Sequence, residues 1–442
     1  MSQFRQLISV IVILLGLSLS AAQDAIYFEV DSSELHPNAI ILLDFLVHEI
    51  KLSSDYGELK IIGHTDSDGS LKYNKKLSLE RSMTVLNYLY SKNISNRIHV
   101  ISKGELEPVN DNSSKSSKSK NRRVQFLRSE KKVHDSFQNA DTQTFNIYTA
   151  NDTLIIGDKG TKIIVSKSIF KDVDPGIQIE IQLQEFYDKS SFVMNKLTTL
   201  TTSNSILESR GMIHIKAIQS GRELQLKDSR SFEILFKDRL EKDGTEIFYG
   251  ADRGSEKIWD DKLQSVPKIK LDSFLSWSET VTTYQVLINE KGIITDTLST
   301  EVKIIRGSIV TTPEERYNNK ISSELLLKSN RLGWINCDRF WEDIRPKRDI
   351  YVEIEEDLDP VLSLVFKSIN AVLPYSYRVD HKYVFRNIPI NEDIEIIGIN
   401  KTELTPTIQF ARIAHNTSCD TAVKLKFQHK AYNTIKLELK NL

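Results

Sequence analysis

The sequence predicts a multidomain chain, in which an α/β N-terminal domain is followed by two mainly antiparallel β domains. Two N-terminal segments carry apolar residues at helical spacing and alternate with short apolar runs that suit strands. Later segments alternate polar and apolar residues with a period of two, and glycine and proline separate them. The length of 442 residues corresponds to about three domains.

The N-terminal domain, residues 24–128, is predicted to be a sheet with its helices on one face. Helices are expected over residues 38–50 and 72–91, because each carries an apolar stripe and Pro37 suits the start of the first. Short strands are expected at residues 25–28, 59–62, 98–101 and 123–126. Alternating strands and helices of this kind form a layered α/β sheet.

The most informative motif is the loop Gly63-His64-Thr65-Asp66-Ser67-Asp68-Gly69, which joins the second predicted strand to the second helix. Asp66 lies where the strand ends, and Asn74, Ser78 and Arg81 share one face of the helix. These positions suit a ligand with both an ammonium and a carboxylate, since aspartate binds the first and the arginine fork binds the second. The alternative is a structural Asp66–Arg81 ion pair.

The pattern Gly-His-Thr-Asp-Ser-x-Gly-Ser-x-x-Tyr-Asn-x-x-Leu-Ser-x-x-Arg resembles the OmpA-like, peptidoglycan-associating domain family. The likeness continues through Gly104-Glu105 to Asn121-Arg122-Arg123-Val124 and covers residues 24–128. It implies that Asp66 and Arg81 clasp the diaminopimelate of the peptidoglycan stem peptide. Supporting contacts are implied for Thr65, Asn74 and Asp31, and a more structural or peripheral role for Asn121 and Arg122. We add Leu77, which lies on the same helix as Asn74 and Arg81.

Two features depart from the family pattern. Residues 113–120 form a serine- and lysine-rich stretch where the family usually has a Gly-Arg element, and Asp31 stands later in the first strand than is usual. We predict that residues 113–120 are a loop. The basic cluster from Lys115 to Lys132 is interpreted as solvated loop and linker, with attraction to anionic envelope polymers as the alternative.

The N-terminus predicts export. Arg5 precedes an apolar run at residues 7–17, and the small residues Ser20-Ala21-Ala22 follow. This run is shorter than the about 20 residues that a spanning helix needs, so residues 1–23 are expected to be a cleaved signal peptide. A retained signal anchor is the alternative. No later segment suits a transmembrane helix, and we expect a periplasmic protein associated with the cell wall and outer membrane.

The net charge and the motifs argue against several classes of function. The formal net charge of −1 argues against nucleic acid as a partner. We find no catalytic or metal-binding motif, so no cofactor and no enzymatic activity are expected. Cys337 and Cys419 are the only cysteines. A disulfide between them is expected in an oxidising periplasm, and two free buried thiols are the alternative.

The remaining sequence is predicted to be mostly β-structure. Residues 129–144 suit a linker, and residues 145–260 a β-sandwich, with a clear alternation at residues 177–184. This part resembles a β-sandwich module common in envelope proteins of the Bacteroidetes. Residues 261–317 are mixed and residues 318–442 form a second β-rich domain. Within it, residues 333–340 are interpreted as a tight corner between strands, with an aromatic contact surface as the alternative.

These observations together predict a scaffold that binds peptidoglycan and holds its β domains in the cell envelope. The β domains would contact another envelope protein or the outer membrane. One alternative is a glycan- or peptide-processing enzyme that the N-terminal domain targets to peptidoglycan. Another is a surface adhesin or sensor.

Overall fold

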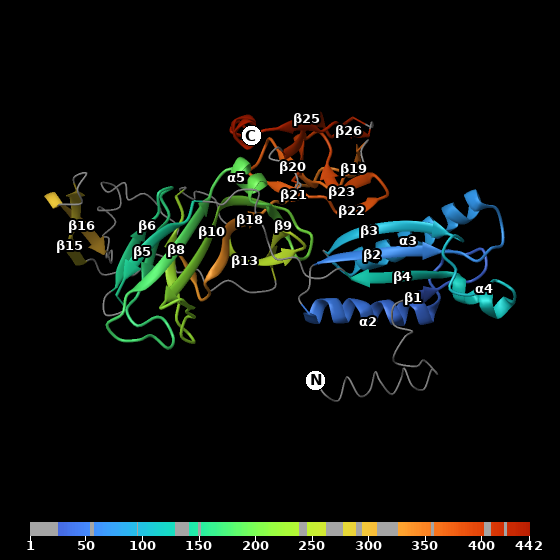
Figure 1. Ribbon diagram of the computed structural model, residues 1–442, viewed down its shortest axis with the longest axis horizontal. Coiled ribbons are helices and arrows are strands. Elements are labelled where there is room, and N and C mark those ends of the chain that lie inside the picture. The colour runs from blue at the N-terminus through green and yellow to red at the C-terminus, as the bar shows by residue number, and fades with distance from the viewer. Residues whose placement is uncertain are drawn as a thin grey trace.

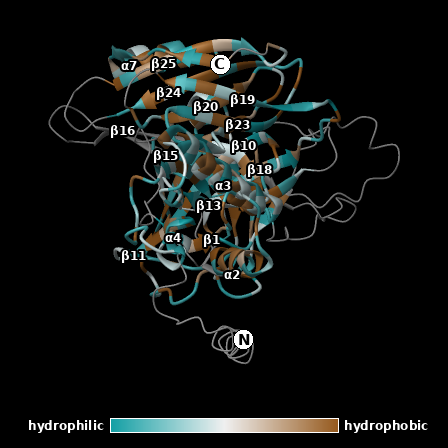
Figure 2. Ribbon diagram, turned by 90° about the vertical axis from the view of Figure 1, so that its right-hand side faces the viewer, coloured by the Kyte–Doolittle hydropathy of each residue, from teal (hydrophilic) through white to brown (hydrophobic). Residues whose placement is uncertain are grey.

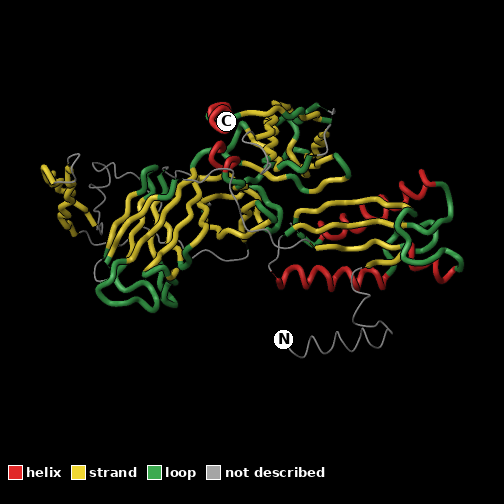
Figure 3. Tube along the Cα trace, in the orientation of Figure 1, coloured by secondary structure: helices red, strands yellow, loops and turns green. Residues whose placement is uncertain are grey.

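The computed structural model shows an N-terminal unit of mixed α/β structure and two units built almost entirely of strands (Figure 1; Figure 3). This confirms the predicted fold class. The structure describes residues 25–53, 57–94, 96–128, 141–148, 152–237, 245–261, 277–288, 294–306, 326–354, 358–401, 408–419 and 422–442. The predicted signal peptide and most of the predicted linker lie outside these residues. In the described part, no helix is long and apolar enough to cross a bilayer.

The N-terminal unit contains every helix and strand that the sequence predicts for it. Its strands are β1 (Ala25–Tyr27), β2 (Glu58–His64), β3 (Arg97–Gly104) and β4 (Arg123–Arg128), and its long helices are α2 (Pro37–Ser53) and α3 (Leu71–Ser91). The strand order is β1-β4-β2-β3, with β2 parallel to β3 and antiparallel to β4. Leu43 of α2, Val85 of α3 and Ile61 of β2 share one buried core. Both helices therefore pack on the same face of the sheet.

The predicted loop at residues 113–120 is instead mostly a short helix, α4 (Lys115–Asn121). Ser114 is its N-cap: the Ser114 hydroxyl accepts from the backbone N–H of Ser117, and the Ser117 hydroxyl accepts from the backbone N–H of Ser114. Such reciprocal capping stabilises the first turn of a helix. The spacing of Ser114 and Ser117 is that of a helix cap. The serine- and lysine-rich composition of the segment led to the prediction of a loop instead.

The middle unit is a two-sheet sandwich. One sheet has the order β5 (Gln143–Ile147), β8 (Ile179–Phe186), β10 (Leu207–Gln219), β18 (Gly333–Phe340), β13 (Glu246–Arg253), β14 (Glu256–Asp260) and β9 (Leu197–Thr201), with β11 (Arg222–Glu223) beside β10. The other contains β17 (Leu326–Ser329), β12 (Phe232–Leu235), β7 (Lys162–Val165) and β6 (Thr153–Ile156). Ile181, Ile215 and Ile234 contribute to the core between the sheets. The short helix α5 (Lys189–Met194) precedes β9.

Three boundaries differ from the sequence prediction. Strand β5 begins inside the segment predicted to be a linker. Strands β17 and β18 complete the sheets of the middle unit although they follow residue 318. Residues 333–340 are therefore a central strand and not a corner, because Ile335 and Cys337 fill the sandwich core. Within the predicted mixed region, β15 (Trp277–Ile288) and β16 (Ile294–Arg306) form an antiparallel hairpin.

The C-terminal unit also has two groups of strands. One comprises β19 (Lys347–Ile354), β22 (Tyr377–Val379), β23 (Lys382–Pro389) and β26 (Val423–Leu425). The other has the order β21 (Val372–Pro374), β20 (Val361–Phe366), β24 (Asp393–Asn400), β25 (Ile408–Asn416) and β27 (Gln428–Lys430), and helix α7 (Tyr432–Leu439) follows. Figure 2 shows hydrophobic residues recurring along β20, β24 and β25, which agrees with the buried core that these strands share with β19 and β23.

One sheet runs through two units. Strand β22 pairs in parallel with β3, so that Tyr377 lies opposite Ile98 and Val379 opposite Val100. The resulting eight-stranded sheet has the order β1-β4-β2-β3-β22-β23-β19-β26. An uncovered edge strand exposes unpaired backbone groups, and β22 supplies partners for those of β3. No pattern in the sequence predicts this pairing.

A buried ionic cluster joins all three units. Arg97 at the start of β3 lies 3.1 Å from Glu256 of the middle unit, and both side chains are almost fully buried. Arg253 also lies 3.2 Å from Glu256 and donates a 2.9 Å hydrogen bond to the carbonyl of Tyr375 in the C-terminal unit. The Arg97 guanidinium stacks over the Tyr375 ring at 5.1 Å. Glu256 thus neutralises charge from two arginines at the point where the units meet.

The expected disulfide is not formed. Cys337 is a free thiol buried in the core of the middle unit, whereas Cys419 is a free, exposed thiol of the C-terminal unit. The two lie on different units, and the inward direction of Cys337 in β18 is fixed by the strand alternation. Burial also raises the pKa of the Cys337 thiol well above its ordinary value.

Candidate functional site

The candidate site begins where β2 meets α3. A Cβ atom on Gly63 would lie only 2.1 Å from the backbone oxygen of Ser78, so only glycine permits this close approach of strand and helix. Ser70 caps α3 by accepting from the backbone N–H of Tyr73. These two local features bring residues 64–68 next to the helix face that carries Asn74 and Arg81.

The Asp66 carboxylate is bound at the end of β2. Its Oδ2 accepts a 3.0 Å hydrogen bond from Nη1 of Arg122, and its Oδ1 accepts one of 3.3 Å from the backbone N–H of Asp68. Asn74 donates to the backbone oxygen of Asp66 at 3.3 Å and to the carboxylate of Glu105. Asp66 is only 5% exposed.

Arg81 of α3 is fully buried. Its guanidinium donates to the carbonyl oxygens of Ser32, His64 and Glu29 at 2.8, 3.1 and 2.9 Å. These contacts use three of its five N–H bonds. Burial lowers the pKa of Arg81 to about 10, and the nearby charge of Asp66 opposes that effect. Arg81 therefore remains a cation at neutral pH and fixes the backbone that surrounds the site.

Asp31, Leu77 and Thr65 contribute in different ways. Asp31 adopts a positive φ of 54° in the loop after β1, and its carboxylate accepts from the hydroxyl of Tyr73, which is 44% exposed. Leu77 is buried beneath the site. The backbone of Thr65 donates to Gly104 at 2.9 Å, while its buried hydroxyl has no hydrogen-bond partner in the described residues.

Helix α4 closes one side of the site. Asn121 is fully buried and its Oδ1 accepts from the backbone N–H groups of Val109 and Asn110 at 2.9 and 3.0 Å. These hydrogen bonds hold the segment at residues 109–110 against α4. Lys118 of α4 forms an ion pair with Asp68 in the loop after β2, so part of the basic cluster contacts the site and is not free linker.

The site combines charges of both signs. Asp66, Arg81 and Arg122 are buried, and the Glu105 carboxylate accepts from Asn74, so two arginines lie among two carboxylates. The hydroxyl of Thr65 and the Oδ1 of Asn74 are also buried without a hydrogen-bond partner in the described part of the chain. Buried polar atoms are normally satisfied, so these atoms mark a place where a ligand could complete the network.

The structure thus brings Asp31, Thr65, Asp66, Asn74, Leu77, Arg81 and Arg122 together and places Asn121 behind them. The alternative of a structural Asp66–Arg81 ion pair is not what the structure shows. Among described residues the ion-pair partner of Asp66 is Arg122, not Arg81. Sequence reasoning missed this contact because Arg122 follows Asp66 by 56 positions. It also missed His64, which is buried and whose ring nitrogens have no hydrogen-bond partner among the described residues. Burial lowers the pKa of His64 to about 4.

No group of histidine, cysteine, aspartate or glutamate residues in the described ranges could hold a metal ion.

Fold and site define a mixed α/β domain with an arginine–carboxylate cluster at the carboxyl end of its second strand. Residues 27–122 match the OmpA family, and the chain belongs to this family. It is 37% identical over 115 residues to the peptidoglycan-associated lipoprotein of Pseudomonas putida, a match that covers 25% of this chain and 68% of that protein. It is 38% identical over 101 residues to outer membrane protein A of Bordetella avium, covering 23% of this chain and 52% of that protein. The chain thus spans only about half the length of the Bordetella relative.

Among solved structures, the crystal structure of the peptidoglycan-associated lipoprotein from Burkholderia pseudomallei matches with 25% identity and a TM-score of 0.23. That match covers 24% of this chain and 90% of the other. These relatives concern the N-terminal unit. The resemblance of the middle unit to Bacteroidetes β-sandwich modules stays a prediction.

Proposed function

We propose that this chain binds peptidoglycan non-covalently by recognising the zwitterionic end of diaminopimelate in the stem peptide. The family supports this proposal, because relatives matched over two thirds of their length are named for their association with peptidoglycan. The observation that carries it is the buried Asp66 carboxylate, which pairs with Arg122 near the buried Arg81. The hydroxyl of Thr65 and the Oδ1 of Asn74 have no hydrogen-bond partner among the described residues.

Each end of the ligand has a partner in this proposal. The ammonium binds Asp66, whose carboxylate is held in place by Arg122 and the loop backbone. The carboxylate binds the two N–H bonds of Arg81 that the backbone carbonyls leave unused. Asp31, Thr65, Asn74 and Leu77 line the site around them.

The tethering role rests on the way the units are joined. Strand β22 continues the sheet of the N-terminal unit, and the Arg97–Glu256 pair is buried between units. Apolar residues including Phe192 of α5, Val365 of β20 and Ile435 of α7 form a shared core between the middle and C-terminal units. A chain bound to peptidoglycan would therefore hold its β units at a fixed position in the envelope, where they would contact another envelope protein. Residence in the periplasm at the cell wall and outer membrane is part of the proposal.

The test is co-sedimentation of the chain from residue 24 onward with insoluble peptidoglycan. The whole chain is used because an isolated N-terminal fragment would expose the edge of β3. Peptidoglycan containing diaminopimelate should sediment the protein, whereas peptidoglycan with lysine in its place lacks the second carboxylate and should bind at least tenfold more weakly. Equal binding to both would refute diaminopimelate recognition while leaving peptidoglycan binding itself intact. A zymogram with the same material tests the enzyme alternative, which a cleared zone would support.

A further inference from the structure

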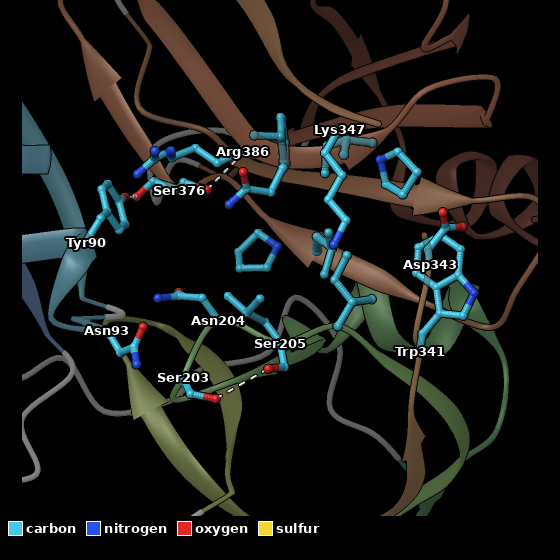
Figure 4. Close-up of a pocket in the computed structure, with 18 of the residues that line it drawn as sticks. Tyr90, Asn93, Ser203, Asn204, Ser205, Trp341, Asp343, Lys347, Ser376 and Arg386 are labelled. Carbon is cyan, nitrogen blue, oxygen red and sulfur yellow. Dashed lines mark hydrogen bonds between the residues drawn. The ribbon is translucent and has the colours of Figure 1, made fainter. Parts of the chain in front are cut away.

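A cavity of about 1000 Å³ lies where the three units meet. Its wall comes from the C-terminal end of α3 with Asn93, from the segment at residues 200–206 of the middle unit, and from β23 and the segment after β18 (Figure 4). Figure 4 shows Tyr90 and Asn93 on one side of this space and Trp341 and Asp343 on the other. Because no unit forms the cavity alone, the docking of the units creates it.

The lining is rich in uncharged groups that both donate and accept hydrogen bonds. The carboxamides are those of Asn87, Asn93, Asn204 and Asn387, and hydroxyls come from Ser203, Ser205 and Ser376. Carboxamides and hydroxyls match ligand hydroxyl groups, which likewise act as donor and acceptor. The Asn204 amide reaches the carbonyl of Ile94 at 3.5 Å, which attaches this wall of the cavity to the end of α3.

Flat apolar surfaces complete the lining. Trp341 is half-buried and packs edge-on against Phe366 at 5.1 Å, and Pro374 and Pro389 also face the cavity. A pocket for a small molecule usually combines apolar walls with a few polar groups. Here polar groups are more numerous, which suits a ligand with many hydroxyl groups and apolar ring faces.

Most charges in the lining are already neutralised. Arg253 is paired with Glu256, Arg386 stacks on the Tyr90 ring at 4.4 Å and lies 3.8 Å from Asp349, and Asp343 is bound by Arg345. Lys347 has no ion-pair partner among described residues and extends into the space (Figure 4). The carboxylate of Glu342 also lines the cavity and has no ion pair among the described residues. One ammonium and one carboxylate among amides and hydroxyls can hydrogen-bond a neutral ligand, and a single cation is too little for a polyanion.

We infer that this cavity binds an oligosaccharide chain. The volume is at the upper end of the range for small-molecule pockets, which is about 300–1000 Å³, and therefore has room for more than a single sugar. A glycan strand of peptidoglycan and another envelope polysaccharide share the required chemistry. The inference stands independently of the proposed stem-peptide site. Asn74 at that site precedes the cavity residues Asn87 and Tyr90 by 13 and 16 positions in α3, which is about 20–24 Å along the helix axis.

The experiment is isothermal titration of the chain from residue 24 onward with soluble probes that lack a stem peptide. A β-1,4-linked tetramer of N-acetylglucosamine represents the peptidoglycan glycan, a glucose tetramer represents a neutral polysaccharide, and a neutral tetrapeptide represents a protein ligand. We expect one of the two sugars to bind, and the stronger one identifies the source. The tetrapeptide should not bind.

Two variants locate the binding. Asn87 is exposed on α3 and Lys347 is exposed on β19, so Asn87→Ala and Lys347→Ala should fold normally. Each should weaken sugar binding about threefold to tenfold, as expected for one lost hydrogen bond. Asn87→Trp should fill part of the cavity and abolish binding. Lys424→Ala, an exposed lysine of β26, and Asp66→Asn at the stem-peptide site should leave sugar binding unchanged.

Three outcomes would overturn the inference: no sugar binds the parent, the tetrapeptide binds in place of the sugars, or Asn87→Trp binds sugar as the parent does. Loss of sugar binding in Asp66→Asn would also overturn it, because the sugar would then occupy the other site. Failure of the peptidoglycan proposal would instead appear as unchanged sedimentation of Asp66→Asn, and the two failures are therefore distinguishable.

Discussion

Asp66 and Arg122, which are separated by 56 positions in the chain, form a buried ion pair with 3.0 Å between Oδ2 and Nη1. Arg122 also donates to the carbonyl of Phe28 at 3.0 Å. The same guanidinium therefore holds the loop after β2 against the end of β1. The family resemblance implied a more structural or peripheral role for Arg122, and we propose that this contact also orients the Asp66 carboxylate for its ligand.

Removing the Asp66 carboxylate should weaken peptidoglycan binding tenfold to a hundredfold. A charge-assisted hydrogen bond contributes about 1.5–3 kcal/mol, and Asp66→Ala deletes the partner proposed for the ligand ammonium. Asn74→Ala should have a smaller effect because it removes a neutral contact. Sedimentation of folded variants, checked by circular dichroism, measures both. If Asp66→Ala sediments like the parent, the carboxylate serves only the fold.

Replacing Arg122 should have an effect close to that of replacing Asp66. Arg122→Ala leaves the Asp66 carboxylate without its ion pair and frees the loop to move. Arg122→Lys should recover part of the binding, since lysine restores the charge but not the second contact to Phe28. Arg128, exposed at the end of β4, offers a matched control in Arg128→Ala. If folded Arg122→Ala sediments like the parent, Arg122 does not contribute to peptidoglycan binding.

Glu256 should matter more for stability than Arg97. Glu256→Ala removes the carboxylate that the buried arginines Arg97 and Arg253 share, and breaking a buried ion pair in this way costs roughly 3–5 kcal/mol. Arg97→Ala leaves Glu256 paired with Arg253 and should cost less. Urea unfolding of the whole chain compares the two variants. The interpretation of Glu256 as the shared partner fails if Arg97→Ala is the more destabilising change.

The two thiols should differ in reactivity. Cys419 is exposed and should react with a thiol reagent in the native protein, whereas Cys337 is buried and should react only after unfolding. Mass analysis of oxidised, exported protein should find one alkylated site before denaturation and two afterwards. An intramolecular disulfide in that material would contradict the structure at this point.

Asp338 should make stability depend on pH. Burial raises the pKa of Asp338 to about 7 from its ordinary value of 3.8. The folded state consequently binds more protons than the unfolded state between these values, and this group lowers stability as pH rises from about 4 to about 7. Its contribution levels off above that range.

The measurement is urea unfolding of the parent and of Asp338→Asn at several pH values. The difference between the two isolates this carboxyl group from the buried histidines, whose lowered pKa has the opposite effect: stability is lost as pH falls from about 6.5 towards 4. The parent should lose stability relative to Asp338→Asn as pH rises. A constant difference would mean that Asp338 has an ordinary pKa.

The sequence by itself determined the helices and strands of the N-terminal unit. Helical spacing in α2 and α3 and the alternation of these helices with short apolar runs are short-range signals, and the structure has the helices and strands where they predict them. Only the tertiary structure decided which side chains and strands pair with one another within the chain. The Asp66–Arg122 pair, the parallel pairing of β22 with β3, and the membership of β18 in the middle sandwich all join positions far apart in the chain. Alternation in a strand fixes which side chains turn inward, but it does not fix which strand lies alongside, because that choice depends on packing across the whole molecule.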